Sequence, residues 1–364
     1  MMREARVHRL ATSGPDDVSG LLAAIADGRI DPHGIVAILG KTEGNGCVND
    51  FTRAFAVSAL KAALAGHLAP AEVDRIAYVM SGGTEGALSP HILVLERTRS
   101  DGVGPALAIG SALTPALPPQ ALGRMAQVRQ VADGVRAAMA DAGITDPADV
   151  HFVQIKCPLL TAARIGAVEA EGDTVATRDT LKSMGLSRGA SALGVAVALG
   201  EIAGADIGDA AIGRDTTLWS SRASTSAGVE LDNHEIVVLG MSDQWGGPLR
   251  VDHAVMADAI DTAPVRAALG RLGLSDDVRA DGRLVALLAK AEPGSTGRLR
   301  GKRHTMLDDS DISATRHARA FVGGVLAGLV GTSEIFVSGG AEHQGPDGGG
   351  PVALIAERAT GTRA

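Results

Sequence analysis

The feature that most restricts the fold of this sequence is a strand-like apolar segment that ends in a lysine and occurs three times. These segments cover residues 35–40, 150–155 and 284–289, and they lead into Lys41, Lys156 and Lys290. A second strand-like segment, also present three times, ends in a serine that small residues follow, at Ser81, Ser226 and Ser338. Since lysine precedes serine in every copy, the chain carries three copies of one unit.

Each copy also has a helical pattern between its lysine and its serine. The pattern opens with an arginine and continues with small and apolar residues at helical spacing, at Arg53, Arg188 and Arg319. The main helices are predicted near residues 49–67, 120–142, 183–203 and 311–329. The lysines lie too far apart for a short solenoid repeat. We therefore expect an α+β fold of three homologous strand-helix-strand repeats, arranged with internal pseudo-threefold symmetry around a central active site.

Glycine and proline mark the expected boundaries between the units. They are dense in residues 102–119 and again in residues 244–248. The predicted units are residues 1–103, 111–248 and 254–364. Whether their strands join one closed sheet or form three separate sheets is left open by periodicity.

Composition excludes several classes of function. The net charge of −8 argues against binding to nucleic acid or to an anionic membrane surface. No apolar run is long enough for a signal peptide or a membrane span, and two cysteines indicate a reducing compartment, so a cytoplasmic protein is expected. Aromatic residues are only 2% of the chain, so a site for a flat ring must rely on hydrogen bonds rather than stacking.

The recurring residues are suited to activating a serine nucleophile. A lysine normally has a pKa of about 10.4, and burial or nearby cations lower it until the neutral amine can take the proton of a serine. Glycines after the serines leave backbone N–H groups free to bind carbonyl oxygens. Glu43 and Glu292 follow their lysines by two residues, whereas Lys156 has no such neighbour. We therefore expect Lys156 to be the most easily deprotonated of the three.

Other chemistries fit the sequence less well. His91, His234 and His343 follow the serines at three different distances, and no Gly-x-Ser-x-Gly motif is present, which disfavours a Ser-His-Asp triad. Residues 40–42 resemble part of a phosphate loop but lack its first glycine. A catalytic zinc is not expected, because no His or Cys pairs have ligand spacing. The glycine-rich segment 338–351, together with Glu292, could hold a hard cation through oxygen ligands.

Four long motifs closely resemble those of the cyanuric acid hydrolases and barbiturases. They are GKTEGNGCVNDFTR at 40–53, MSGGTEG at 80–86, HTMLDDS at 304–310 and SGGAEHQGP at 338–346. The resemblance extends over nearly the whole chain. It implies an enzyme that opens cyanuric acid to carboxybiuret, which decarboxylates to biuret. The alternatives are a barbiturase that converts barbituric acid to ureidomalonate and, from another class, a non-catalytic protein that binds a small ring.

The resemblance also implies roles for individual residues. Lys156 and Ser226 would form the catalytic pair. The substrate would be bound by residues of all three units, namely Arg53, Ser81, Gly82, Arg188, Ser226, Ala227, Arg319, Ser338, Gly339, Lys41 and Lys290. Arg319 is preferred over Arg316 because it repeats the Arg-Ala-Phe wording of Arg53. No organic cofactor is implied. A structural magnesium or calcium ion would be held by Glu292, Ala341, Gln344, Gly345, Pro346 and Gly349, and the enzyme would be a homotetramer.

Overall fold

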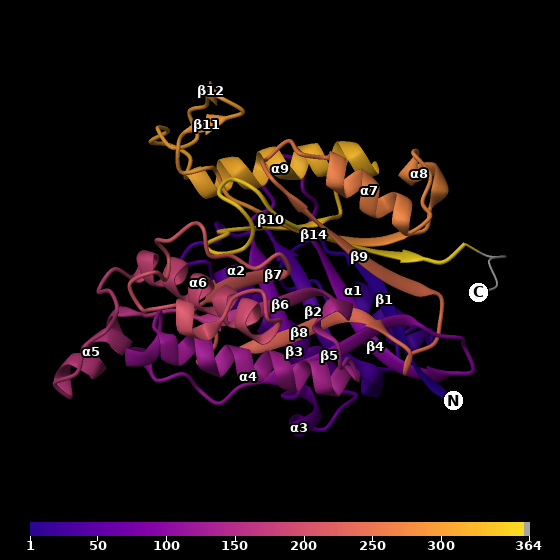
Figure 1. Ribbon diagram of the computed structural model, residues 1–364. Coiled ribbons are helices and arrows are strands. Elements are labelled where there is room, and N and C mark those ends of the chain that lie inside the picture. The colour runs from indigo at the N-terminus through magenta and orange to yellow at the C-terminus, as the bar shows by residue number, and fades with distance from the viewer. Residues whose placement is uncertain (360–364) are drawn as a thin grey trace.

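The computed structural model describes residues 1–359, so that the end of the third expected unit, residues 360–364, lies outside the described range. Three four-stranded sheets occupy the middle of the molecule (Figure 1). The protein therefore has a mixed α+β fold with separate sheets rather than one closed sheet. Among the described residues, no helix is both long enough and apolar enough to cross a membrane.

All three sheets have the same order of strands. The first sheet has the order β1 (Met2–Ala11), β4 (His91–Ser100), β2 (Ile35–Thr42) and β3 (Ala77–Gly82). The second has the order β5 (Ala106–Leu113), β8 (Glu235–Ser242), β6 (Val150–Pro158) and β7 (Ala223–Gly228). The third has the order β9 (Leu249–Met256), β14 (Gly350–Glu357), β10 (Leu284–Ala291) and β13 (Phe336–Gly339). In each sheet the second and third strands along the chain run parallel.

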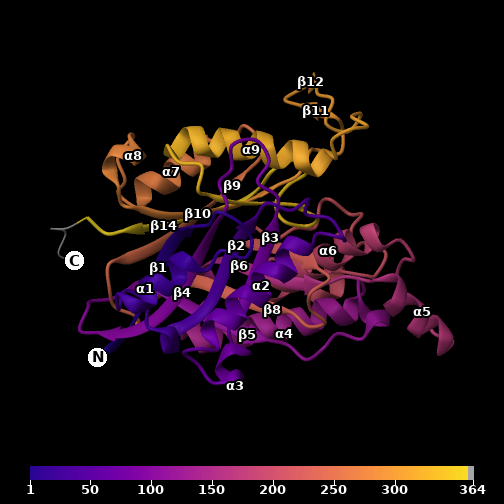
Figure 2. The same ribbon diagram turned by 180° about the vertical axis from the view of Figure 1, so that it is seen from behind.

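A parallel pair needs a crossover connection, and a helix supplies it in each unit. These helices are α2 (Phe51–Leu64), α6 (Thr180–Ala198) and α9 (Ala314–Val330). They begin at Asp50, Asp179 and Ser313, whose side chains accept hydrogen bonds from the first turn. The other helices are α1 (Ser19–Ala26), α3 (Pro70–Val73), α4 (Met125–Ala142), α5 (Ala162–Ala170), α7 (Ala263–Arg271) and α8 (Val278–Asp281). Figure 2 shows α1 and α2 on the side opposite to α4.

The sheets share one buried core. One face of each sheet contributes to it, as Leu39, Ile155 and Leu288 illustrate. The other face of the first sheet packs on α1 and α2, and that of the third sheet packs on α7 and α9. Burial of both faces explains why the lysine-terminated strands are continuous apolar runs in the sequence.

The structure differs from the sequence prediction in three details. The segment 102–119, expected as a boundary, contains β5, because its glycines and prolines flank an apolar stretch at 106–113. The third sheet begins at Leu249, before the expected start of its unit at 254. The expected helix openings also differ: Arg188 lies about two turns inside α6, since Asp179 starts this helix earlier. The exact division into three units stays a prediction.

A short ribbon extends from the third unit. It consists of β11 (Arg298–Leu299) and β12 (Lys302–Arg303), which pair antiparallel. The ribbon projects from the end of the molecule near α9 (Figure 1). It contains part of the segment before the HTMLDDS motif, so this motif lies at the surface rather than in the core.

Candidate active site

Each lysine lies beside the serine of its own sheet. In the three parallel ladders Lys41 is paired with Ser81, Lys156 with Ser226, and Lys290 with Ser338. Since parallel strands share their carboxyl ends, the order of lysine and serine in the sequence is enough to bring them to one edge. The same register in three sheets produces three equivalent pairs.

The three serine hydroxyl groups meet in one cluster. Ser226 Oγ lies 2.9 Å from Ser338 Oγ, and Ser81 Oγ donates a hydrogen bond of 3.2 Å to Ser338 Oγ. All three side chains are buried. One hydroxyl from each sheet therefore reaches the same small region at the centre of the molecule.

The lysines connect the units in a cyclic order. Lys41 Nζ donates to the carbonyl of Val337 at 2.7 Å, the residue before Ser338. Lys290 Nζ donates to the carbonyl of Thr225 at 2.9 Å, the residue before Ser226. Lys156 Nζ donates to the carbonyl of Met80 at 2.5 Å, the residue before Ser81. Each lysine thus holds the serine strand of a different unit.

The arginines connect the units in the opposite cyclic order and pair with glutamates of other units. Arg188 donates to both carboxylate oxygens of Glu342, at 2.8 and 2.6 Å, and Arg319 binds Glu85 in the same bidentate way. Arg53 Nε lies 3.5 Å from Glu230. Each glutamate stands four residues after the serine of its unit. These glutamates are not among the residues expected from the sequence, although their constant spacing is visible there.

A small cavity is formed at the serine cluster. It is lined by all three serines, all three arginines and a single lysine, Lys156, among the described residues. Gly82, Ala227 and Gly339 also line it, as expected, together with two residues that were not expected, Gly46 and Met184. Lys41 and Lys290 are not at its wall, and they donate instead to Ser81 at 3.4 Å and to Ser338 at 3.1 Å.

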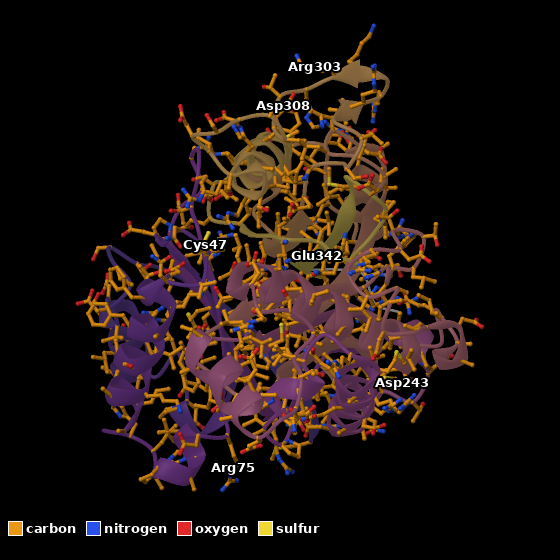
Figure 3. All side chains as sticks on the ribbon, turned by 90° about the vertical axis from the view of Figure 1, so that its left-hand side faces the viewer. Cys47, Arg75, Asp243, Arg303, Asp308 and Glu342 are labelled. Carbon is orange, nitrogen blue, oxygen red and sulfur yellow. The ribbon has the colours of Figure 1, made fainter. Side chains whose placement is uncertain are left out.

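A larger cleft of about 640 Å³ leads to this cavity. The two share five wall residues, namely Gly46, Met184, Arg188, Arg319 and Gly339. Cys47 and Glu342, both labelled in Figure 3, line the cleft. Arg316 lines the cleft but not the cavity, whereas Arg319 lines both. This placement favours Arg319 as the third arginine at the serine cluster.

Burial is the main influence on the three lysines. It lowers the pKa of Lys41 well below its usual value, and the charge of Arg319 lowers it further. Burial and Arg188 together lower the pKa of Lys290 to about 7. Burial also lowers the pKa of Lys156, but Glu230 acts in the opposite direction from 2.9 Å away. Burial is therefore the larger cause of the low lysine pKa values, and the nearby cations, which the sequence indicated, are a smaller one.

Lys156 was expected to be the most easily deprotonated lysine because no glutamate follows it by two residues, but a carboxylate from elsewhere in the unit lies beside its amine and raises its pKa. Glu43 lies just beyond the end of β2 and is exposed, so the pleat of the strand no longer directs its side chain toward Lys41. Glu230, from the segment after β7, contacts Lys156 instead. Spacing along the strand could not reveal a carboxylate that a loop brings back to the lysine.

The second glycine after Ser81 and after Ser338 has an N–H group that is already bonded within the protein. The N–H of Gly83 donates to the carbonyl of Thr42 at 2.8 Å, and that of Gly340 donates to Glu292 at 2.8 Å. A Cβ atom at Gly83 would lie 2.1 Å from Arg319, and one at Gly340 would lie 2.4 Å from Arg188. These two positions require glycine because an arginine of another unit packs directly on the backbone.

The expected cation ligands lie close together. Glu292, Ala341, Gly345 and Pro346 line one pocket of about 290 Å³. Burial and the nearby Glu342 raise the pKa of Glu292 to about 7, so a cation here would offset the crowding of two buried carboxylates. The side chain of Gln344 is already committed, since its oxygen accepts from Thr225 N at 2.7 Å. Only its backbone oxygen would be available as a ligand. Gly349 lies outside the wall of this pocket.

Histidines do not take part in the serine cluster. Among the described residues, the ring of His91 bonds to the carbonyl of Ser89, and the ring of His343 bonds to the carbonyl of Leu218. The ring of His234 bonds to the side chains of Thr114 and Gln127. A separate cluster consists of His151, His253 and Asp252, and the Nδ1 atoms of the two histidines lie 2.9 Å apart. Asp252 already forms two hydrogen bonds with Arg271, which lies with Arg222 near both histidines. This positive environment disfavours a metal ion there.

The sequence matches a known family over most of its length. The model of the amidohydrolase ring-opening protein family matches residues 6–357. A cyanuric acid amidohydrolase of Azorhizobium caulinodans is 66% identical over 359 residues, which cover 98% of this chain and 99% of the relative. One from Bradyrhizobium sp. strain ORS 375 is 65% identical over 367 residues, with 98% and 99% covered.

Solved structures agree with these matches. The crystal structure of the cyanuric acid hydrolase from A. caulinodans superimposes with a TM-score of 0.94 at 65% identity, and 99% of this chain and 100% of that one are covered. A second cyanuric acid hydrolase structure, described as an evolutionary innovation by structural concatenation, also gives 0.94, at 49% identity with 98% and 100% covered. The resemblance inferred from the four motifs is confirmed, and the chain belongs to the family of ring-opening amidohydrolases.

Proposed function

We propose that the protein opens the ring of cyanuric acid, with Ser226 as nucleophile and Lys156 as its base. The observation that carries this assignment is that Lys156 lines the cavity at the serine cluster, whereas Lys41 and Lys290 do not. The family and the names of the similar enzymes support the choice of substrate. A non-catalytic binding protein would have no need of one lysine that differs from the other two in this way.

The proposed reaction begins with proton transfer from Ser226 to the neutral amine of Lys156. Ser226 Oγ then bonds to a ring carbonyl carbon, the adjacent C–N bond breaks, and Lys156 returns the proton to the departing nitrogen. Water attacks the resulting ester and releases Ser226, which gives carboxybiuret. Loss of carbon dioxide from carboxybiuret leaves biuret. Overall, one water is consumed for each ring opened.

We also infer that the three units form a pseudo-threefold arrangement that suits the symmetry of the substrate. The identical strand order, the three in-register Lys–Ser pairs and the cyclic contacts of the lysines support this. Cyanuric acid has three alternating carbonyl and N–H groups. Each unit would therefore present one serine and one arginine to one edge of the ring, which binds it without aromatic stacking and orients it for attack.

A substrate comparison tests the proposed function. Purified protein is incubated with cyanuric acid or barbituric acid, loss of each ring is followed by ultraviolet absorbance, and biuret is identified as product. We expect a much larger kcat/KM with cyanuric acid. Preference for barbituric acid would make the protein a barbiturase. Binding of either ring without turnover would mean a non-catalytic protein.

The charge of the cleft leads to a second prediction. Five basic residues and one acid line it, Lys182, Arg188, Arg214, Arg316 and Arg319 with Glu342, on a chain whose net charge is −8. An N–H between two carbonyls is acidic, so part of the substrate is an anion near neutral pH. We expect kcat/KM to fall about 3-fold or more when salt is raised from about 0.02 M to about 0.3 M.

Variants show whether the cleft causes this salt effect. Arg214→Gln and Lys182→Gln alter exposed residues at the cleft wall and should lower kcat/KM at low salt while leaving kcat unchanged. Arg75→Gln is the matched control, since Arg75 is exposed and lies at the lower end of the molecule in Figure 3, whereas Glu342 lies near its centre. Equal salt dependence in all three variants would contradict a steering role for the cleft.

We propose that the pocket at Glu292 holds a structural divalent cation, magnesium or calcium. When bound, the ion would neutralise the buried carboxylate; Glu292 would supply the charged ligand, and backbone oxygens of the 341–349 turn would supply the rest. Removal of the ion by chelator should lower the melting temperature by roughly 5–10 °C, because the cation binds only the folded state. Glu292→Gln should melt at the lower temperature and be insensitive to chelator. Identical melting of the wild type with and without chelator would refute the site.

We propose a homotetramer in the cytoplasm. Both cysteines, Cys47 and Cys157, are free thiols, as suits a reducing compartment. Three of the five phenylalanines are largely exposed, Phe51 and Phe55 on α2 and Phe321 on α9, with exposed fractions of 73%, 45% and 42%. Such apolar exposure favours contacts between subunits. Light scattering of the purified protein would give the number of subunits directly.

A further inference from the structure

The glutamates that follow the three serines differ in what they bind. Glu85 and Glu342 each receive two hydrogen bonds from one arginine. Glu230 occupies the same position in the second unit, but its nearest charged group is Lys156 Nζ, at 2.9 Å from Oε1. Arg53 stands further away, at 3.5 Å. Only in the second unit, therefore, does this glutamate contact the lysine of its own Lys–Ser pair.

Glu230 is held in place but has unused capacity to accept hydrogen bonds. Its side chain is 7% exposed, and neither carboxylate oxygen has a hydrogen-bond partner of good geometry within residues 1–359. A Cβ atom at Gly228 would lie 2.2 Å from Oε2, so the carboxylate packs directly on the backbone two residues after Ser226. A buried carboxylate that depends on ion pairs alone needs a cation beside it, since isolated buried charge is costly. The Arg53 guanidinium supplies this cation when the Lys156 amine is neutral.

We propose that Glu230 is a positioning residue that completes a carboxylate–lysine–serine triad with Lys156 and Ser226. This inference rests on the proposed function, in which Lys156 is the base. A neutral lysine amine has two N–H groups and one lone pair. The carbonyl of Met80 and the carboxylate of Glu230 face the N–H groups, which leaves the lone pair for the proton of Ser226. When Lys156 takes that proton, Glu230 stabilises the ammonium ion, as the aspartate of a Ser-His-Asp triad does for histidine.

The other two lysines lack this arrangement. Lys290 Nζ lies within hydrogen-bond distance of three oxygens, those of Thr225, Ser338 and Gly339, a set that suits the three N–H groups of an ammonium ion. Lys41 donates to Val337 and to Ser81. In neither of these units does a carboxylate within residues 1–359 form an ion pair with the lysine, so an ammonium ion formed there would lack the partner that Glu230 gives Lys156. The corresponding glutamates are occupied by arginines.

Several charged or titratable groups face Lys156 from the elements around it. Arg53 of α2 lowers its pKa, whereas Glu230 and the neighbouring Cys157 raise it. Glu235 of β8 is the cross-strand partner of Lys156, accepts a hydrogen bond from Tyr78 N at 2.7 Å, and has its pKa raised to about 7 by burial. Glu230 also raises the pKa of Glu235, so both groups need separate variants in a test of pH dependence.

The test compares the pH dependence of kcat/KM in isosteric variants. Glu230→Gln removes the charge that raises the pKa of Lys156, so the acid limb of activity should move to lower pH by at least about one unit. The kcat should fall on the order of 100-fold, because the ammonium ion loses its partner. Glu85→Gln and Glu342→Gln are the matched controls and should raise KM without moving the limb. Glu235→Gln should show its acid limb at the same pH as the wild type, which would exclude Glu235 as the group that titrates there. Ionisation of the substrate affects all variants equally, so it cannot account for a difference between their acid limbs.

Glu230→Ala provides an independent route in case the glutamine variant does not fold. Formate should restore part of its activity, whereas formamide, of similar size and uncharged, should not. Failure of formate to restore activity in folded protein, or an unshifted limb in Glu230→Gln, would overturn the triad. A limb that shifts only in Glu85→Gln or Glu342→Gln would instead place the reactive pair in another unit and refute the assignment of Lys156. No ring opening by the wild type would refute the proposed function itself.

Discussion

Ser226→Ala and Lys156→Ala should each lower kcat for cyanuric acid by at least about 10⁴-fold while the protein remains folded. The first change removes the atom that bonds to the ring, and the second removes the group that takes its proton. Because the two residues act as a unit, the double variant should be no slower than either single variant. Steady-state kinetics and circular dichroism spectra of the three variants provide the measurement.

The equivalent residues of the other units are the appropriate controls. Ser81→Ala and Ser338→Ala remove hydroxyls from the same cluster, at the same position in their strands. They should raise KM and reduce kcat far less than Ser226→Ala does, since they bind the ring without bonding to it. Near-normal turnover by Ser226→Ala, with loss of turnover in Ser81→Ala or Ser338→Ala, would move the chemistry to another unit.

The strands, the crossover helices and the Lys–Ser pairs could be predicted because local patterns determine them. A strand buried on both faces is an apolar run, and two parallel strands joined by a helix bring their carboxyl ends together. Lys41 and Ser81 are therefore neighbours as soon as their strands are parallel. β5 was harder to predict, because glycine and proline on both sides concealed its short apolar core. The pattern of lysine, helix and serine occurs three times, so it could be recognised although each single copy is weak evidence.

The environment of each pair could not be predicted, because it depends on tertiary contacts within and between the units. Glu230 reaches Lys156 from a loop, and Lys156 reaches the carbonyl of Met80 in a different sheet. Neither contact follows from the spacing of residues along a strand. The constant distance from serine to glutamate was available in the sequence, but its partners, Arg53, Arg188 and Arg319, were identified only by the packing. Local sequence thus indicates which residues are present at the site, and the packing of the units determines how they differ.

Arg319→Met should destabilise the protein by about 3–5 kcal/mol, because it leaves Glu85 without its partner beside the buried serine cluster. The guanidinium is almost fully buried, donates to both oxygens of Glu85, and packs on the backbone of Gly83. The same group lines the cavity, so ring binding should weaken as well. Urea unfolding gives the free energy of unfolding, and kcat/KM for cyanuric acid gives the loss of substrate recognition.

The double variant Arg319→Met/Glu85→Gln separates these two roles. With both charges removed, most of the lost stability should return, because no unpaired carboxylate remains. The activity should not return, since the substrate still lacks its arginine. Arg316→Met, one helical turn away, is the control; it should change the free energy of unfolding by less than about 0.5 kcal/mol. If the double variant regained activity together with stability, Arg319 would be a structural residue, and recognition of the third ring edge would have to come from Arg316 or from the serine cluster alone.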